Sequence, residues 1–282
     1  MIGREKGTRF VLPALLLLAL VTIYPILYVL WMSLHRKLLI FGISEFTGLD
    51  NYVFLLHDDR FWNAFRNTAY FTVVSVSLEL LLGLAVALFL DREFRFKGFV
   101  RAVVLIPWAI PTVVSAKMWD WMYNTDFGII NYLLGEKINW LGSPFWALNA
   151  AIVMDVWKTT PFVAILLTGA LQLIPRDLYQ AARVDGAGTW AIFRRITLPL
   201  MVPVMLVTAI FRALDAFRVF DSVYVLTGGG PANSTETLSI YAYKVLFQTL
   251  QFGYGATLST VVFLCVGGIA MLFIAATAGG KR

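Results

Sequence analysis

The sequence contains few of the residues from which catalytic and redox sites are built. Among its 282 residues there are one cysteine and two histidines, and only 14% are charged. The lone Cys265 has no partner for an intrachain disulfide, and His35 and His57 fall in one predicted loop. No HExxH, GxGD or GxxxxGK[ST] motif is present, which argues against a metal site, an intramembrane hydrolase and a nucleotide-hydrolysing chain. We therefore expect a protein that is not an enzyme and that holds no cofactor or metal of its own.

The sequence is instead rich in apolar residues. They make up 59% of the chain, with a mean hydropathy of +0.75, which is more than a soluble core of this length can bury. The runs are continuously apolar, unlike transmembrane strands, and a hydrocarbon core of about 30 Å needs about 20 residues of helix. We predict an all-α integral membrane protein, a single domain of residues 1–282, with six transmembrane helices at residues 10–34, 68–90, 99–122, 145–171, 198–222 and 255–278.

Lys and Arg are unevenly divided between alternate loops. With the N-terminus in the cytoplasm, 13 of the 23 Lys and Arg residues lie inside and six lie outside, which predicts a multi-pass protein with both termini cytoplasmic. These cations stand beside apolar runs, so they indicate contact with membrane lipid and no nucleic-acid partner. The first apolar run follows Arg4, Lys6 and Arg9, but it is too long for a signal peptide and precedes no small-x-small cleavage site. It predicts a retained helix.

Residues 172–197 form a charged insert between the fourth and fifth predicted helices. Pro175 cannot continue the fourth helix. Asp177, with Gln180 three residues later, resembles a capping box, so a short helix is expected to begin there.

The second half of the insert returns the chain to the membrane. Two glycines in the turn 185–188 end the first short helix, and a second is predicted from Thr189 to Ile196. Pro199 and Pro203 follow. The insert is therefore predicted to be a cytoplasmic helix-turn-helix; an interfacial amphipathic connector that touches only lipid is the alternative.

The spacing in this insert resembles the EAA loop of permease subunits in binding-protein-dependent ABC importers. Ala181-Ala182 and then Gly186 are followed, after nine residues, by Ile196-Thr197-Leu198-Pro199. The resemblance implies a prokaryotic inner-membrane permease subunit. Its implied partners are a second homologous permease, two ATPase subunits that carry ATP and Mg, and an extracytoplasmic sugar-binding protein. A channel or scaffold subunit, the alternative, would leave the loop unexplained.

In that family the first helix of the loop docks into a groove on the ATPase. One residue departs from the pattern, because the usual Glu is Gln180 here. A charge-assisted contact then becomes a neutral hydrogen bond of about half the strength. We expect docking to depend on shape, through Leu178, Ala181, Ala182, Gly186 and Ala187. The full set of implied ATPase contacts is Leu178, Gln180, Ala181, Ala182, Asp185, Gly186 and Ala187.

Two predicted outer segments extend the resemblance. GIINYLL, after the third predicted helix, resembles the family's G-x-x-N-x-x-L, and FDSVYVLTGGGP resembles the outer loop before the last helix in MalF-type subunits. The final AGGKR differs from the GAVKG-like tail of the companion subunit, which favours the MalF-type half of a heterodimer. The implied contact of the binding protein is loop 223–254, with Gly228, Gly229, Gly230 and Pro231; an exposed turn without a partner is the alternative.

Four ionisable residues lie deep in the predicted helices. Asp155 and Lys158 are three residues apart, as are Arg212 and Asp215, so each pair places opposite charges on one helical face. A charge inside a membrane must be paired or face water. We expect these four residues to neutralise each other while lining a wet central cavity.

Other charged residues are predicted to have structural roles. Lys117 with Asp120, and Arg218 with Asp221, share the three-residue spacing but lie near helix ends, where structural pairing is favoured. Glu79 in the second predicted helix is expected to face the bundle interior, and its partner is not identified by the sequence.

A sugar suits such a cavity, because its hydroxyls bond to Asp, Lys, Arg and Thr and its C–H face packs on an aromatic ring such as Phe162 or Phe217. DVWKTTPF resembles the segment of helix 4 that lines the sugar site in maltose-type permeases. The implied substrate is a di- or oligosaccharide such as trehalose or maltose, with another small polar solute such as glycerol phosphate as the alternative. Thr159 and Thr160 also suit ordinary bonding between helices. The implied contacts are Asp155, Lys158, Thr159, Phe162, Arg212, Asp215, Ala216 and Val219.

Overall fold

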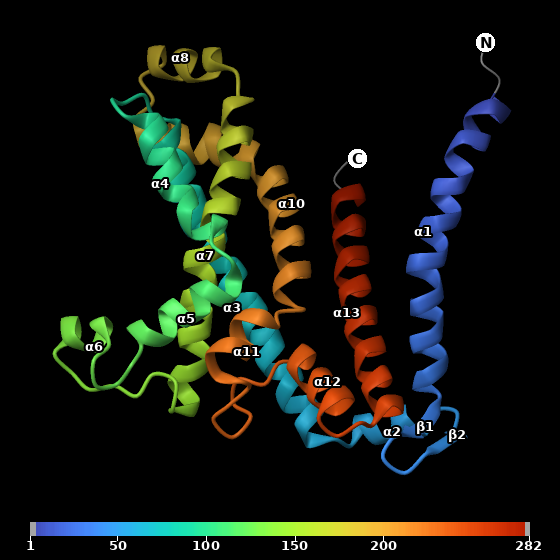
Figure 1. Ribbon diagram of the computed structural model, residues 1–282. Helices are drawn as coiled ribbons and strands as arrows, with labels where there is room; N and C mark the ends of the chain where they lie inside the picture. Colours follow the sequence, from blue (N-terminus) through green and yellow to red (C-terminus); the bar gives the residue numbers. More distant parts are fainter. Residues whose placement is uncertain (1–3, 280–282) are drawn as a thin grey trace. The chain divides into compact units, whose positions relative to one another are not determined.

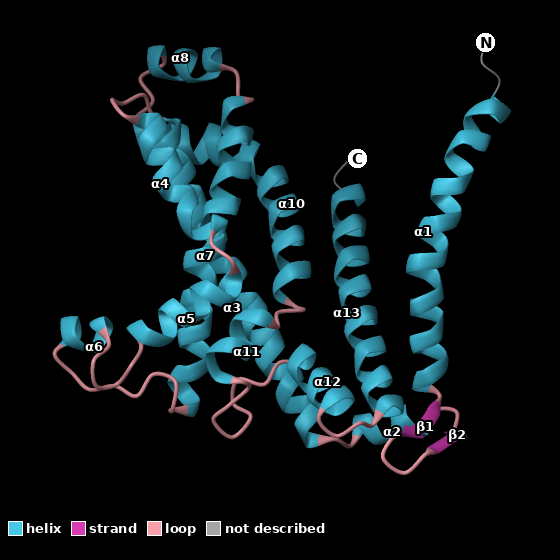
Figure 2. Ribbon diagram, viewed as in Figure 1, coloured by secondary structure: helices cyan, strands magenta, loops and turns pink. Residues whose placement is uncertain are grey.

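Helices make up nearly all of the secondary structure in the computed structural model, which describes residues 4–279 (Figure 2). The first and last three residues of the predicted domain lie outside this range. A bent pair of helices counts as one candidate membrane span if its two parts are taken together. Within the described range, five further helices are long and apolar enough to cross a membrane: Val11–Ser33, Asp59–Asp91, Pro144–Gln172, Thr189–Ala216 and Phe252–Ala275. The predicted six-span helical fold is confirmed.

The chain divides into two compact units. The first consists of Met1–Phe61 and Tyr241–Cys265, and the second of Trp62–Ile240 and Val266–Arg282. Three helices, α3 (Asp59–Asp91), α12 (Leu238–Phe247) and α13 (Phe252–Gly279), run through a boundary between the units. Each unit has its own internal contacts and is described separately.

The first unit contains a β-hairpin that the sequence did not predict. Helix α1 (Arg4–Ser33) is followed by the antiparallel strands β1 (His35–Leu38) and β2 (Ile43–Phe46) and by α2 (Asp50–Leu56). Most of α12 (Leu238–Phe247) and the first half of α13 (Phe252–Gly279) complete the unit (Figure 1). Strands of four residues, with the sequences HRKL and ISEF, are too short to show a clear alternation of apolar and polar residues.

A half-buried carboxylate links the segments of the first unit. Asp58 accepts hydrogen bonds from the hydroxyls of Tyr241, at 2.6 Å, and Tyr254. The guanidinium carbon of Arg60 lies 4.7 Å from the centre of the Tyr241 ring. Burial, together with the bond to Asp58, raises the pKa of Tyr241. The hydroxyl therefore stays protonated and remains a donor at neutral pH.

The second unit is built around α7 (Pro144–Gln172). Sixteen residues of this helix are buried, and many are alanines, which let neighbouring helices approach closely. Helices α4, α5, α10 and α11 contact it. The elements of this unit, in chain order, are most of α3 (Asp59–Asp91), α4 (Lys97–Ala109), α5 (Thr112–Met122), α6 (Ile129–Leu134), α7, α8 (Arg176–Val184), α9 (Thr189–Ile192), a π-turn (Phe193–Thr197), α10 (Leu198–Ala216), α11 (Asp221–Thr227), the start of α12 and the second half of α13.

The predicted third helix, residues 99–122, is not a single helix. Helices α4 and α5 meet at an angle of 92°. Ile110 between them is extended, with ψ of 134°, because it precedes Pro111 and the proline ring disfavours the helical conformation there. The chain is therefore broken in the middle of an apolar run.

The predicted fifth helix begins earlier and ends sooner than residues 198–222. Helix α9, the π-turn and α10 form one continuous span, Thr189–Ala216, so the predicted second short helix is not separate. In the π-turn the N–H of Leu198 bonds to the carbonyl of Phe193, and this wider turn accommodates the proline that follows. Beyond Ala216, the carbonyl of Val219 accepts a bond from Thr237 instead of a helical N–H.

Helix α8 begins without the predicted capping box. Pro175 occupies the cap position, no side chain caps the helix, and Asp177 lies inside the first turn. Pro175 already has the fixed φ that suits a helix start, so no side-chain acceptor is needed. The helix ends where Gly186 adopts φ of +76°, with the N–H of Ala187 bonded to the carbonyl of Ala182 at 2.9 Å.

Candidate functional site

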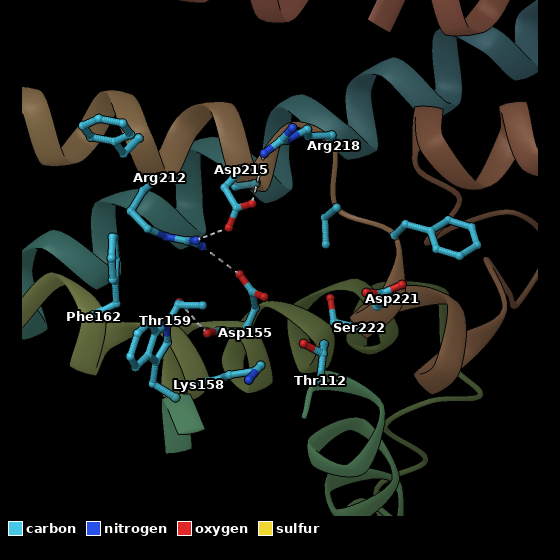
Figure 3. A pocket seen from close by; sticks show the side chains of 15 residues that line it. Thr112, Asp155, Lys158, Thr159, Phe162, Arg212, Asp215, Arg218, Asp221 and Ser222 are labelled. Carbon is cyan, nitrogen blue, oxygen red and sulfur yellow. Dashed lines mark hydrogen bonds and ion pairs between the residues drawn. The ribbon is translucent and has the colours of Figure 1, made fainter. Parts of the chain in front are cut away.

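A cavity of about 530 Å³ opens among α4, α5, α7, α10 and α11 in the second unit (Figure 3). All eight residues predicted to contact substrate line it: Asp155, Lys158, Thr159, Phe162, Arg212, Asp215, Ala216 and Val219. The sequence did not identify the remaining lining residues, which come from both sides of the α4–α5 break, from α10 and from the region after it: Trp108, Thr112, Phe211, Arg218, Phe220, Asp221 and Ser222.

Arg212 is the centre of a cluster of charges in this cavity. Its side chain is 5% exposed and points from α10 towards α7 (Figure 3). Nη1 donates to Asp215 at 2.6 Å, and Nη2 lies 3.4 Å from Asp155. The predicted Arg212–Asp215 pair is confirmed. The fixed fork of donors in a guanidinium allows it to bind several carboxylates at once.

Glu79 on α3 is the third carboxylate at Arg212. It accepts from Nε at 2.5 Å and from Nη2 at 3.0 Å, and its side chain is 0% exposed. The predicted inward orientation of Glu79 is confirmed. Its partner lies 133 residues away. One feature of the sequence could have pointed to this partner, because a buried acid needs a cation and that cation can lie on another membrane span.

Thr159 lies between two acceptors. Its hydroxyl is 2.7 Å from Oε1 of Glu79 and 2.7 Å from the carbonyl oxygen of Asp155. It has one proton to donate to either of them. The bond to Glu79 is the interhelical contact that the sequence offered as the ordinary role of this threonine.

Lys158 does not pair with Asp155 as predicted. Its Nζ donates instead to the carbonyl oxygen of Ile110 at 2.6 Å. Ile110 lies outside both α4 and α5, where a helix no longer supplies a donor to its carbonyl. Lys158 therefore satisfies a backbone group at the break, while Asp155 has Arg212 as its cation.

Of the two ion pairs predicted to have a structural role, one is confirmed and the other is wrong. Lys117 bonds to Asp120 at 3.2 Å, as expected. Arg218 lies 3.7 Å from Asp215 instead of pairing with Asp221. Because α10 ends at Ala216, the three-residue spacing no longer places residues 218 and 221 on one helical face.

Of the two candidate aromatic rings, one faces the cavity. Phe162 lines it and stacks on Trp108, with ring centres 5.8 Å apart and an angle of 28° between the planes. Phe217 is 6% exposed and packs against Phe65. The cavity therefore offers a flat aromatic pair on one side and the charged cluster on the other.

The residues predicted to contact the ATPase gather on α8 and the turn after it. This helix has no buried residue, and Leu178 is 43% exposed. Tyr179 anchors the helix through a hydrogen bond of 3.3 Å to Thr197. The small side chains of the predicted set, from Gln180 to Ala187, are exposed or half-buried, so they form an accessible surface.

The glycine-rich turn after α11 is internally bonded. Gly228 and Gly229 adopt φ of +61° and +92°, conformations that glycine adopts readily. Thr235 donates to the carbonyl of Gly230 at 2.8 Å, and its hydroxyl lies 2.7 Å from that of Thr227. The turn from Gly228 to Pro231 therefore has a defined shape.

Residues 79–278, which include the whole cavity, match the model of the family described as "Binding-protein-dependent transport system inner membrane component". The chain belongs to this family. It is an integral membrane permease subunit of an ATP-driven importer, not an enzyme. It works with a second permease subunit, separate ATPase subunits and a binding protein.

Individual relatives agree with this assignment. The chain is 42% identical over 274 residues to the trehalose/maltose transport system permease protein MalF of Thermococcus litoralis, covering 96% of this chain and 92% of the relative. It is also 42% identical over 286 residues to the trehalose transport system permease protein SugA of Mycobacterium tuberculosis, covering 100% and 92%.

A solved structure has the same fold as this permease subunit. A chain of a bacterial ABC transporter involved in the import of the acidic polysaccharide alginate aligns with a TM-score of 0.86 and 22% identity. The alignment covers 100% of this chain and 98% of the other. The helical order described above is therefore that of an ABC importer permease.

Proposed function

We propose that this permease subunit forms half of the pathway for a neutral sugar, a di- or oligosaccharide such as trehalose or maltose. The observation that carries the proposal is the cavity itself, which sets hydrogen-bonding side chains opposite the stacked rings of Phe162 and Trp108. A sugar needs both kinds of surface. Two relatives that the chain matches along almost its whole length are named for trehalose or maltose transport.

The charge of the cavity favours a neutral substrate over glycerol phosphate. Three acids (Asp155, Asp215 and Asp221) and three bases (Lys158, Arg212 and Arg218) line it. Glu79 adds a further negative charge behind Arg212. Since three carboxylates surround the guanidinium of Arg212, a phosphate would meet more negative than positive charge at this point.

The cavity residues divide by accessibility. Asp215, whose side chain is 61% exposed, is the acid best placed to accept sugar hydroxyls. Phe162 supports the ring, while Ala216 and Val219 form the wall. Arg212, Asp155 and Thr159 form the polar floor, and Lys158 contacts the sugar only if its Nζ leaves the carbonyl of Ile110 or is shared with it.

The coupling contact is proposed for α8. The exposed side of this helix and the turn at Gly186 dock on the ATPase through Leu178, Gln180, Ala181, Ala182, Asp185, Gly186 and Ala187. The absence of buried residues in α8 supports this role, because a short helix without buried contacts of its own gains from a partner.

The proposed ATPase contact and the proposed binding-protein contact lie towards opposite ends of α7. In Figure 1, α8 lies beyond one end of α7, while α6 and α11 lie towards the other. With α8 in the cytoplasm, both termini are cytoplasmic, and the turn from Gly228 to Pro231 faces the binding protein outside. Residues 1–282 would then act as one permease domain.

Uptake by the purified importer in proteoliposomes tests the substrate. With binding protein outside and ATP inside, we expect labelled trehalose or maltose to accumulate and labelled glycerol 3-phosphate not to. Accumulation of glycerol 3-phosphate instead would overturn the sugar assignment. Sugar flux that persists without ATP would indicate a channel.

A further inference from the structure

A second cavity, of about 520 Å³, lies within the first unit. The hairpin and the start of α2 line it on one side, and the segment that leads into α13 lines it on the other. It is separate from the charged cavity described above, which belongs to the second unit. Four of its lining residues, Thr249, Leu250, Gln251 and Tyr254, belong to the loop 223–254 that the sequence analysis assigned to the binding protein, but none of its residues lines the charged cavity.

Two membrane spans fix the depth of this second cavity. The α1 span ends at Ser33 and the α13 span begins at Phe252, and the cavity lining begins at Arg36, just after the first span, and ends at Tyr254, in the first turn of the second. The N–H of Leu39 bonds to the carbonyl of Leu250 at 3.2 Å. A Cβ at Gly253 would overlap the carbonyl oxygen of His35, so the backbone of β1 lies directly against the start of α13.

The hairpin is short enough to remain in the headgroup region. Each strand has four residues, which reach about 13 Å at the rise of a β-strand. Its turn exposes apolar side chains, with Ile40 65% and Phe41 72% accessible. Exposed apolar residues beside the end of a span are placed to enter the boundary between headgroups and acyl chains.

The cavity wall also carries unpaired positive charge. Arg36 and Lys37 line it, and within residues 4–279 neither makes an ion pair. Asp50 is the acid in the wall, so the lining holds two cations and one anion. Phe54 and Leu38 provide apolar surface beside them.

We propose that this second cavity binds an anionic phospholipid. Arg36 and Lys37 bind the phosphate, and Ile40 and Phe41 at the hairpin turn contact the acyl chains. A headgroup with a net negative charge is favoured because each cation near a membrane surface attracts anionic lipid. A free phosphate ion would use the two cations but would leave the apolar turn without a role.

Lipid retention by the intact importer tests this proposal. The whole complex is reconstituted in nanodiscs that contain phosphatidylglycerol and phosphatidylcholine, extracted in mild detergent, and analysed by native mass spectrometry for lipid that remains bound. The test variants are Arg36→Gln, Lys37→Gln and the two combined. The matched control is Arg66→Gln, which removes an exposed cation that does not line the cavity and that makes no ion pair with the residues the structure describes.

We expect phosphatidylglycerol to be retained by the unmodified complex and by Arg66→Gln. Retention should weaken by about fivefold for each cation removed from the cavity. Phe41→Ser should also weaken it without changing the charge. Equal retention by the control and the double variant would overturn the proposal, as would equal retention of both lipids.

Two additional measurements separate other occupants. Millimolar inorganic phosphate is added to the unmodified complex and to the double variant. If it displaces the lipid from the unmodified complex and has no effect on the double variant, the site is a simple anion site and the lipid assignment fails. If the double variant keeps its lipid but loses stimulation of ATP hydrolysis by the binding protein, the surface contacts that protein and the proposal is wrong. Uptake by the single variants shows that the complex is assembled, and a failure of sugar uptake in the unmodified complex would leave the lipid result unaffected.

Discussion

The Nζ of Lys158 donates a hydrogen bond of 2.6 Å to the carbonyl oxygen of Ile110. This bond connects a residue in the wall of the charged cavity to the point at which α4 and α5 separate at 92°. In a membrane, a backbone carbonyl released from a helix has no water to replace the lost donor. Lys158 therefore stabilises the break, and any substrate that attracts its ammonium group competes with the backbone.

Replacing Lys158 by methionine should destabilise the complex and reduce uptake. The change keeps a side chain of similar length but leaves the carbonyl of Ile110 without a donor, a loss of about 1–3 kcal/mol. Thermal inactivation and initial uptake rates measure the two effects. Lys158→Arg, which retains donors, should be milder, and Lys117→Met, at an exposed pair, should change neither. A Lys158→Met complex as stable as the unmodified one would show that the bond does not matter.

Arg212→Met should cause the largest loss of stability. It leaves Glu79, which is 0% exposed, as an unpaired buried charge, and breaking such a pair costs about 3–5 kcal/mol. Adding Glu79→Gln to Arg212→Met should restore part of the loss, because the remaining group is then neutral. The measurement is a double-mutant cycle on thermal inactivation, with Lys137→Met as the exposed control. Purely additive effects of the two changes would contradict the direct pairing.

Asp215→Ala should impair sugar uptake while the complex still assembles. The side chain is 61% exposed, and Arg212 keeps Glu79 and Asp155 as partners, so the fold loses little. The loss of a hydrogen bond to a substrate hydroxyl predicts about a fivefold to tenfold increase in the KM of uptake. Asp120→Ala, another acid paired three residues away from its cation, is the control. An unchanged KM would remove Asp215 from the sugar site.

Gly186→Trp should prevent the ATPase from docking. No atom lies within 4 Å of a Cβ at this glycine, so the bulk projects outward, and the left-handed φ of +76° adds a cost of about 1 kcal/mol. Gly135→Trp is a closely matched control, since Gly135 has φ of +71° and equally open surroundings at the end of α6. Co-purification of the ATPase is measured for both. Docking at α8 would be contradicted if both variants kept the ATPase, or if both lost it to the same extent.

The sequence predicted the membrane spans and the residues that line the charged cavity better than it predicted the hydrogen bonds and ion pairs between those residues. Long apolar runs identify helices because burial in lipid depends on composition, and all eight proposed sugar contacts meet in one cavity. The partner of Glu79 was missed because it lies on another helix, 133 residues away, and local spacing carries no information about such contacts. The partner of Lys158 was missed because it is a backbone atom.

Proline shows the limit of local reasoning most directly. Pro107 and Pro161 lie inside helices, yet the chain breaks at Pro111. In a membrane protein, neighbouring groups decide whether a helix continues through proline. At Pro111 the donor that stabilises the break is Lys158, which no pattern near residue 111 reveals.

The continuous helix from Thr189 to Ala216 has a mechanical consequence. Within α10, Arg212 lies about 21 Å from Leu198, at 1.5 Å per residue. A tilt of about 10° of this helix about its start would displace the guanidinium by about 4 Å, which breaks any hydrogen bond that it makes. Either α3 and α7 tilt with α10 as one body, or the bonds of Arg212 to Glu79 and Asp155 break and re-form in every cycle. The charged cluster thus determines how many helices must move together in each cycle of the ATPase.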